Sequence, residues 1–272
     1  MSGMELGLLA AVLLAAGFAS GVVAGLLGVG GGIILVPVLF QTFVIFDLPT
    51  YLQIHMAVGT SLAIICFTGT QSARAHFKRG AVEVEVLKSW GAFIAVGALS
   101  GAIAARFIAP AGLKIIFATL ALTMAVRMVT SKNGGEAGTA RISAGVQKAL
   151  ASLIGFFSSL MGIGGGTLSV PLLNASGHDV LRAVATSSVL GVIIAVPATL
   201  GFIIGGWNLP DLPPLALGYV NLLAFLMIIP ASMVAAPLGA KLAHKLSKAT
   251  LNKIFAGFLF VSGGRMLLAL II

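Results

Sequence analysis

A short glycine-rich motif occurs twice in this chain and limits what the chain can fold into. The first copy runs Gly28-Val-Gly-Gly-Gly32 and the second Gly162-Ile-Gly-Gly-Gly166, and they lead into the pairs Val36-Pro37 and Val170-Pro171. Glycine weakens a helix and proline removes a backbone donor, so each copy is expected to interrupt a helix. Inside a membrane, such a break is tolerated only where protein or a ligand satisfies the freed backbone groups.

Both copies lie in stretches that carry no charge. The composition is 59% hydrophobic and 8% charged, whereas a soluble domain carries about 25% charged residues. A helix needs about 20 apolar residues to cross a bilayer. Uncharged stretches include residues 8–27, 89–105, 149–177, 183–210 and 212–240. The sequence therefore predicts an all-α, polytopic helical membrane protein that forms a single transmembrane domain over residues 1–272.

Charge and cysteine content argue against other classes. The formal net charge is +9, but the Lys and Arg residues collect in short loops between apolar runs, which fits membrane orientation better than nucleic-acid binding. Cys66 is the only cysteine, so neither a disulfide framework nor a cysteine-based metal site is expected. We expect the lipid bilayer as surroundings, and no metal, no cofactor and no nucleic-acid partner.

The duplication extends beyond the glycines. The segment Ala57–Ser61 matches Ala183–Ser187, and Gly101–Met128 matches Gly239–Met266 at one constant offset. Three matching windows in the same order indicate an internal repeat. If each repeat holds an odd number of spanning segments, the second copy is inverted in the membrane. Inverted repeats are typical of secondary transporters, whose substrate site lies at the repeat interface.

We predict a first repeat over residues 1–131 and a second over residues 141–272, joined by a linker at 132–140. Each repeat is expected to contain five hydrophobic segments. The second segment of each repeat is too short for a full span and is predicted to be broken or re-entrant. The ten segments are expected at residues 5–27, 32–46, 56–73, 89–107, 112–130, 146–162, 166–177, 183–205, 215–237 and 252–271.

The distribution of positive charge predicts the orientation. Of the 16 Lys and Arg residues, 13 lie in four loops that share one side if the spans alternate. These loops are residues 74–88, 127–148, 178–182 and 241–253. The positive-inside rule then places them in the cytoplasm of a bacterium and both termini outside its inner membrane.

The glycine motifs are the main candidates for ligand binding. A glycine lets backbone N–H groups approach a ligand closely, and a following helix start adds unpaired N–H groups and partial positive charge. Such a turn can hold an anion without a charged side chain. The competing interpretation is close helix packing, which needs small residues at every fourth position and not in a row. The predicted anion-binding glycines, expected to face one another, are Gly30, Gly31, Gly32, Gly164, Gly165 and Gly166.

Two Thr-Ser pairs follow the glycine motifs at matching places. Thr60-Ser61 and Thr186-Ser187 are expected to start the third segment of each repeat, where their hydroxyls either bind the anion or cap the helix. Arg127 and Arg265 are also repeat equivalents, each near the end of its last segment. They are predicted either to reach the headgroups and pair structurally or to gate the pathway and attract anions.

Acidic residues are expected only near loops and termini. They are Glu5, Asp47, Glu83, Glu85, Glu136, Asp179 and Asp211. Cation transporters and proton pumps usually place a carboxylate inside a span, so the pattern favours an anionic substrate. The sequence shows no nucleophile–base pair or metal motif, so an enzyme is not expected.

The doubled glycine motif with its Val-Pro pair, the inverted halves and the following Thr-Ser resemble the TauE/SafE sulfite exporter family. The resemblance implies a bacterial inner-membrane permease for small sulfur-containing anions such as sulfite, sulfoacetate or other sulfonates, which works in the direction of export by alternating access. The alternatives are a permease for another small anion (a carboxylate, thiosulfate or a sulfate-like ion) and a non-transport membrane protein. We expect a monomer or a homodimer.

The two copies of the motif differ in polarity. The second Val-Pro pair is preceded by Thr167-Leu168-Ser169, and the first by Ile33-Ile34-Leu35. The two halves of the predicted anion site are therefore not expected to be chemically equal.

Overall fold

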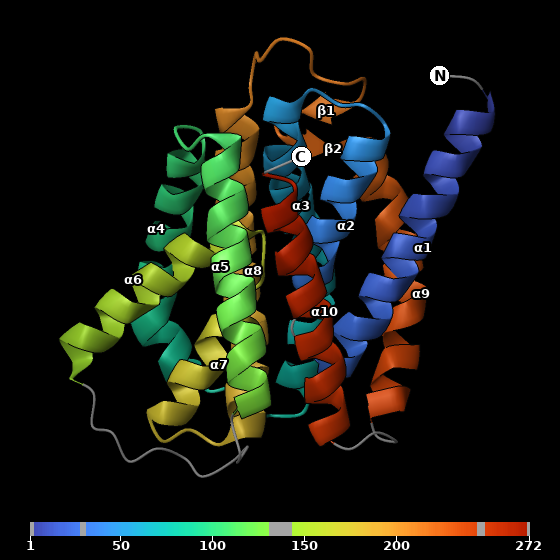
Figure 1. Ribbon diagram of the computed structural model, residues 1–272. Helices are drawn as coiled ribbons and strands as arrows, with labels where there is room; N and C mark the ends of the chain where they lie inside the picture. Colours follow the sequence, from blue (N-terminus) through green and yellow to red (C-terminus); the bar gives the residue numbers. More distant parts are fainter. Residues whose placement is uncertain (1–2, 28–30, 131–142, 244–247, 271–272) are drawn as a thin grey trace.

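The structure, a computed structural model, describes residues 3–27, 31–130, 143–243 and 248–270. This part of the chain forms a bundle of helices with one short hairpin of two antiparallel strands (Figure 1). The elements are α1 (Gly3–Leu27), α2 (Gly32–Ile45), α3 (Thr50–Lys78), α4 (Val84–Ala105), α5 (Pro110–Thr130), α6 (Ala144–Met161), α7 (Gly166–Ala175), α8 (Val180–Gly205), β1 (Ala216–Leu217), β2 (Val220–Asn221), α9 (Leu222–Ala243) and α10 (Lys248–Leu268). The predicted polytopic helical fold is confirmed.

Within the described residues, six helices are long and apolar enough to cross a membrane. Their spanning parts are Gly7–Ala24, Thr50–Lys78, Val84–Ala105, Pro110–Arg127, Ala144–Met161 and Leu181–Gly205. By contrast, α2 has 14 residues and α7 has 10. At about 1.5 Å per residue they extend about 21 and 15 Å, well short of a hydrocarbon core of about 30 Å. The prediction of a short second segment in each half is confirmed.

The third segment of the first half begins earlier than expected, so Thr60 and Ser61 lie inside α3 and not at its start. Two polar residues before them, Gln53 and His55, are buried, and their side chains bond to backbone carbonyls. Gln53 Nε2 donates to the Leu48 carbonyl at 2.8 Å, and His55 Nε2 donates to the Ala105 carbonyl at 3.0 Å. These bonds let a polar stretch continue a buried helix.

The segment expected as a helix from residue 215 begins instead as the β1–β2 hairpin. Leu215 and Gly218 have positive φ, 61° and 56°, and this left-handed conformation interrupts a right-handed helix. Tyr219 then packs inward, with its ring 5.0 Å from that of His55 and 6.1 Å from that of Phe202. As a result, α9 begins only at Leu222.

Helices from the two halves of the chain are interleaved (Figure 1). α1 packs along α9, α6 along α4, α5 along α10, and α3 against α8. Small residues allow the closest approaches. A Cβ on Gly21 of α1 would collide with the backbone of Ser232, and a Cβ on Gly155 of α6 with the carbonyl of Ile94. Gly21 and Gly155 are separated by the same spacing as the two glycine motifs.

α3 forms the centre of the bundle. Of the residues in its apolar window, 83% are buried, against 44% or less in the other five spans. Both short helices lie beside a central helix, α2 against α3 and α7 against α8. The predicted anion-binding glycines and Thr-Ser pairs that the structure describes therefore lie in the interior of the bundle.

Candidate functional site

The first glycine turn ends at Gly31, which caps the start of α2. Gly31 has φ 71°, and its carbonyl accepts from the N–H groups of Ile34 at 3.1 Å and Leu35 at 3.3 Å. A Cβ at this position would lie 2.9 Å from the carbonyl oxygen of Ser20. The turn therefore requires glycine on both conformational and steric grounds. Gly30, the first predicted binding residue, lies outside the described residues.

The second glycine turn joins α6 to α7. Gly162, with φ 66°, ends α6, and Gly165 caps α7 by accepting from the Ser169 N–H at 2.9 Å. Gly164, Gly165 and Gly166 are all buried. Because these three residues have no side chains, neighbouring helices can pack closely against the start of α7.

The prolines after the glycines do not end the short helices. Pro37 lies inside α2 and Pro171 inside α7, so the chain is broken at the glycines and the helix then runs through the proline. Because proline has no N–H, the carbonyls four residues earlier, at Ile33 and Thr167, lack their usual helical donor.

The two turns meet beside α3. A Cβ on Gly32 would lie 2.8 Å from the carbonyl oxygen of Gly162. The Ser61 hydroxyl donates to that same oxygen at 2.7 Å and lies 3.4 Å from the Gly32 carbonyl. The structure thus brings together Gly32 and Ser61, two of the predicted residues, with the first glycine of the second motif.

Gly165 packs against α8. The three atoms nearest to a Cβ on Gly165 belong to Leu190, Gly191 and Ile194, the closest being the Gly191 nitrogen at 3.0 Å. Ser187 lies one turn before Gly191 on the same face of α8. Its hydroxyl is buried, with 1% exposure, and has no hydrogen-bond partner among the described residues.

The two threonines bond to the opposite half of the chain in matching ways. Thr60 Oγ1 accepts from the N–H of Asn221 at 2.9 Å, and Thr186 Oγ1 accepts from the N–H of Glu83 at 3.0 Å. Asn221 precedes α9 and Glu83 precedes α4, which are the fourth helices of the two halves. Each threonine on a third helix therefore holds the start of a fourth helix from the other half.

The structure does not bring Arg127 and Arg265 together. Each lies in the last turn of its helix, and α5 and α10 run in opposite directions, so the two arginines are at opposite ends of the bundle (Figure 1). Arg265 lines a cavity of about 280 Å³ between α1, α2 and α10, together with Gln41, Thr42 and Ser262. This cavity is not lined by the predicted glycines or Thr-Ser pairs.

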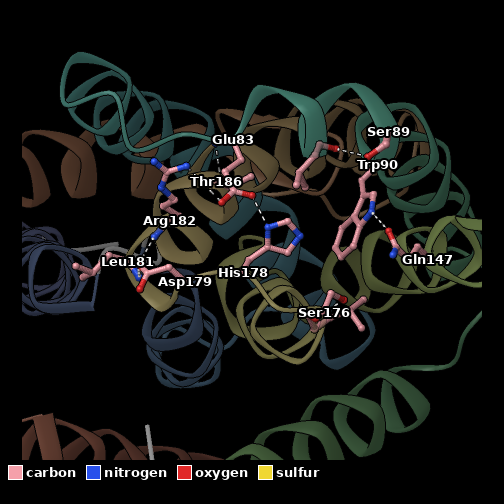
Figure 2. A network of polar contacts seen from close by, with 12 residues as sticks. Glu83, Ser89, Trp90, Gln147, Ser176, His178, Asp179, Leu181, Arg182 and Thr186 are labelled. Carbon is pink, nitrogen blue, oxygen red and sulfur yellow. Dashed lines mark hydrogen bonds and ion pairs between the residues drawn. The ribbon is translucent and has the colours of Figure 1, made fainter. Parts of the chain in front are cut away.

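A polar network ties the α7–α8 loop to the start of α4 (Figure 2). His178 pairs with the carboxylate of Glu83, and Arg182 approaches the other carboxylate oxygen at 4.0 Å. Asp179 caps α8 by accepting from Leu181 N–H at 2.9 Å. The sequence placed these residues near loops but gave no indication that the loop would reach α4.

The interior of the described bundle contains no carboxylate. The described acidic residues lie in loops or at helix starts: Asp47, Glu83, Glu85, Asp179 and Asp211, together with Glu5 in the first turn of α1. In the same residues no group of three His, Cys, Asp or Glu side chains is placed to hold a metal ion. The buried polar groups around the glycine turns are hydroxyls and backbone groups, which can donate hydrogen bonds to an anion.

Sequence reasoning missed one residue beside the glycine turns, Gly191. The signal was available, because the offset that relates Ala57–Ser61 to Ala183–Ser187 aligns Gly191 with Ile65. A glycine inside an apolar helix, where the other half has isoleucine, indicates a close approach of another backbone.

Comparisons with known proteins all indicate the same class of protein, a membrane transporter. Over residues 13–266 the chain matches the family described as Sulfite exporter TauE/SafE. A Haemophilus influenzae protein called "Probable membrane transporter protein" is 36% identical over 255 residues, which cover 93% of this chain and 96% of that one. A probable membrane transporter protein of Methanocaldococcus jannaschii is 30% identical over 277 residues, covering 96% of each chain. No solved structure gives a significant match.

These matches span almost the whole helical bundle, including both glycine turns and the helices that hold them. The protein is a multi-pass membrane transporter, and its chain belongs to the sulfite exporter TauE/SafE family.

Proposed function

We propose that this protein is a permease for small sulfur-containing anions, such as sulfite, sulfoacetate or other sulfonates, and that it exports them across the bacterial inner membrane. The observation that carries the proposal is the pair of short helices, α2 and α7, whose glycine turns meet in the buried centre of the bundle beside Ser61. The family description gives the substrate class.

The chemistry of this region suits such an anion. A sulfite or sulfonate group presents three oxygens that accept hydrogen bonds, and the starts of α2 and α7 supply N–H groups and partial positive charge. The Ser187 hydroxyl, which has no hydrogen-bond partner among the described residues, adds a donor. Because no lysine, arginine or carboxylate of the described chain lies among them, binding is weak enough for release, which transport requires.

We further propose that residues 1–131 and 141–272 are inverted repeats that move against each other in alternating access. The matching bonds from Thr60 to Asn221 and from Thr186 to Glu83 support this view. In each bond, a threonine on the third helix of one half contacts the residue that precedes the fourth helix of the other half. Secondary transporters built from inverted repeats place the substrate at the repeat interface and expose it by rocking one repeat against the other.

Flux measurements test the proposal. Purified protein in liposomes should transport labelled sulfite, with sulfoacetate and thiosulfate as competitors and with and without a proton gradient. We expect Gly31→Val and Gly165→Val each to abolish flux, because the first side chain needs an unfavourable backbone conformation and the second collides with α8. Gly7→Val, whose Cβ meets nothing within 4 Å, should keep it. Undiminished flux in both turn variants would refute the site.

A further inference from the structure

The two halves of the region around the glycine turns are not equivalent. By the offsets that align the repeats, Ser169 corresponds to Leu35, Gly191 to Ile65, and Ser187 to Ser61. The first half therefore presents leucine and isoleucine where the second half presents serine and glycine. Both halves keep a serine at the position of Ser61 and Ser187, but Ser61 is already engaged as a donor to Gly162.

In the first half, apolar side chains fill the space between the short helix and its neighbour. A Cβ on Gly32 would collide with the Cδ1 atom of Ile65, and Leu35 is completely buried. On the α3 side of the turns, the Ser61 hydroxyl donates its proton to a backbone carbonyl. Leu35, Ile65 and Ser61 therefore leave no donor for a ligand, and the hydroxyl that remains in this half is that of Ser20 on α1, beside Gly31.

In the second half, Ser169 and Ser187 lie on the two helices that form the α7–α8 contact. The helices run antiparallel, and Gly165 lies opposite Gly191. One turn further along α7 is Ser169, and one turn back along α8 is Ser187, so the same packing places these two side chains opposite each other. Ser169 is 0% exposed and Ser187 is 1% exposed. Neither hydroxyl has a hydrogen-bond partner among the described residues.

We propose that one singly charged oxyanion binds asymmetrically, between α7 and α8, held by the hydroxyls of Ser169 and Ser187. The inference rests on the proposed function and assigns its substrate to one half of the bundle. The first turn of α7 contributes the positive end of its dipole, and glycine at 165 and 191 lets the backbones of α7 and α8 come into contact one turn away from the two serines. Ser169 points back toward that turn because side chains on a helix tilt toward its N-terminus.

The charge of the ligand follows from the same surroundings. Two hydroxyls and a short helix dipole compensate one negative charge, whereas a second buried charge without a cation would be strongly unfavourable. The site should therefore prefer hydrogensulfite, or a simple sulfonate such as methanesulfonate, to doubly charged sulfate. The described residues at this position include no lysine or arginine that would reverse the preference.

Binding of labelled sulfite to the purified full-length protein tests the assignment. Each of Ser169→Ala and Ser187→Ala removes one hydrogen bond to a charged ligand, so we expect the dissociation constant to rise about tenfold or more. Ser188→Ala is the matched control, because this buried hydroxyl already donates to the Ala185 carbonyl at 2.7 Å. It should bind as the parent does. Methanesulfonate should compete better than sulfate at equal concentration.

A second measurement separates binding from folding. Without anion, the melting temperatures of Ser169→Ala and Ser187→Ala should equal or exceed that of the parent, because neither serine forms a hydrogen bond that the substitution would remove. Anion added at saturation should then stabilise the parent and Ser188→Ala more than either variant. A lowered melting temperature without anion would indicate a structural role and overturn the assignment.

The remaining outcomes distinguish this inference from the proposed function. If the parent transports sulfite and both serine variants bind it as tightly as the parent, the α7–α8 site is wrong and the permease function stands. If Arg265→Gln abolishes binding while the serine variants do not, the anion binds in the α1–α2–α10 cavity, which also overturns the site. If the parent neither binds nor transports any sulfur oxyanion, both proposals fail.

Discussion

At the scale of single residues, identical side chains in equivalent positions have different surroundings. Ser61 donates to the Gly162 carbonyl and so joins the two halves of the bundle, whereas the Ser187 hydroxyl has no partner among the described residues. The difference arises because the residues around them diverged, Ile65 on one side and Gly191 on the other. The repeat alone therefore identifies both serines but does not assign their roles.

Ser61→Ala should destabilise the protein. The substitution leaves the buried Gly162 carbonyl without the donor at 2.7 Å, which costs about 1–3 kcal/mol. We expect a lower melting temperature of the purified protein in detergent. Ser100→Ala is the control, since that exposed hydroxyl donates to the Gly97 carbonyl within its own helix. An equal melting temperature for Ser61→Ala and the parent would contradict the assigned bond.

The sequence predicted the helix breaks at the two glycine motifs. Gly31 and Gly162 were recognised as breaks, and both have positive φ in the structure. The contact of Gly32 with Gly162 follows from the fold and not from the motif, since it depends on how α2 and α6 approach α3. The predicted meeting of Gly30–Gly32 with Gly164–Gly166 stays a prediction, with Gly30 outside the described residues.

At the scale of elements, hydropathy predicted the helices well and their starts poorly. The short α2 and α7 were expected because glycine bounds them on one side and polar residues on the other. The start of α3 was missed because Gln53 and His55 read as loop residues, although both are buried and bonded to backbone carbonyls. The start of α9 was missed because an apolar hairpin has the hydropathy of a helix.

The fourth helix of each half is held by a threonine of the opposite half, and this bond can be tested. Thr60→Val removes the acceptor of the Asn221 N–H, and Thr186→Val removes that of the Glu83 N–H. Each loss should lower the free energy of unfolding by about 1 kcal/mol, because a buried donor loses its partner.

Hydrogen exchange measured by mass spectrometry distinguishes the two threonine variants from each other. Thr60→Val should speed exchange at the start of α9 and leave the start of α4 protected, and Thr186→Val should do the reverse. Each variant thus serves as the control for the other. Equal exchange at both sites in both variants would show that these bonds do not hold the helix starts.

At the scale of the whole molecule, the pairing of helices links the two chain halves throughout. α1 lies against α9 and α6 against α4, so each half contributes one helix to the flank of the other. The central pair, α3 and α8, carries both Thr-Ser pairs. If one proposed repeat moves, the helices of the other repeat that pack on its two flanks have to move as well. The proposed substrate region lies at the central contact between the two repeats.

The proposed orientation follows from charge and the arrangement of the helix ends. The Glu83–His178 network and the starts of α4 and α8 lie at one end of the bundle, and the β1–β2 hairpin lies at the other (Figure 1). Most of the Lys and Arg residues that the structure describes lie in or beside the loops at the first of these ends. By the positive-inside rule, we propose that this end faces the cytoplasm.

Thiol labelling tests this orientation directly. Cys66 is the only cysteine in the sequence, so Cys66→Ala gives a background without thiols. On it, Trp207→Cys introduces a thiol at a residue that is 57% exposed beside the hairpin, and Glu85→Cys introduces one at an exposed position in the first turn of α4. Replacing Glu85 leaves the positive charges unchanged, and acidic residues contribute little to orientation.

A membrane-impermeant maleimide applied to intact cells should modify Trp207→Cys at once and Glu85→Cys only after permeabilisation. The reverse pattern would place the basic loops outside and invert the direction assigned to every helix, while leaving the fold and the α7–α8 site untouched. Labelling of both thiols in intact cells would instead mean that the two ends are not separated by a membrane, which contradicts the spanning assignment of α4 and α8.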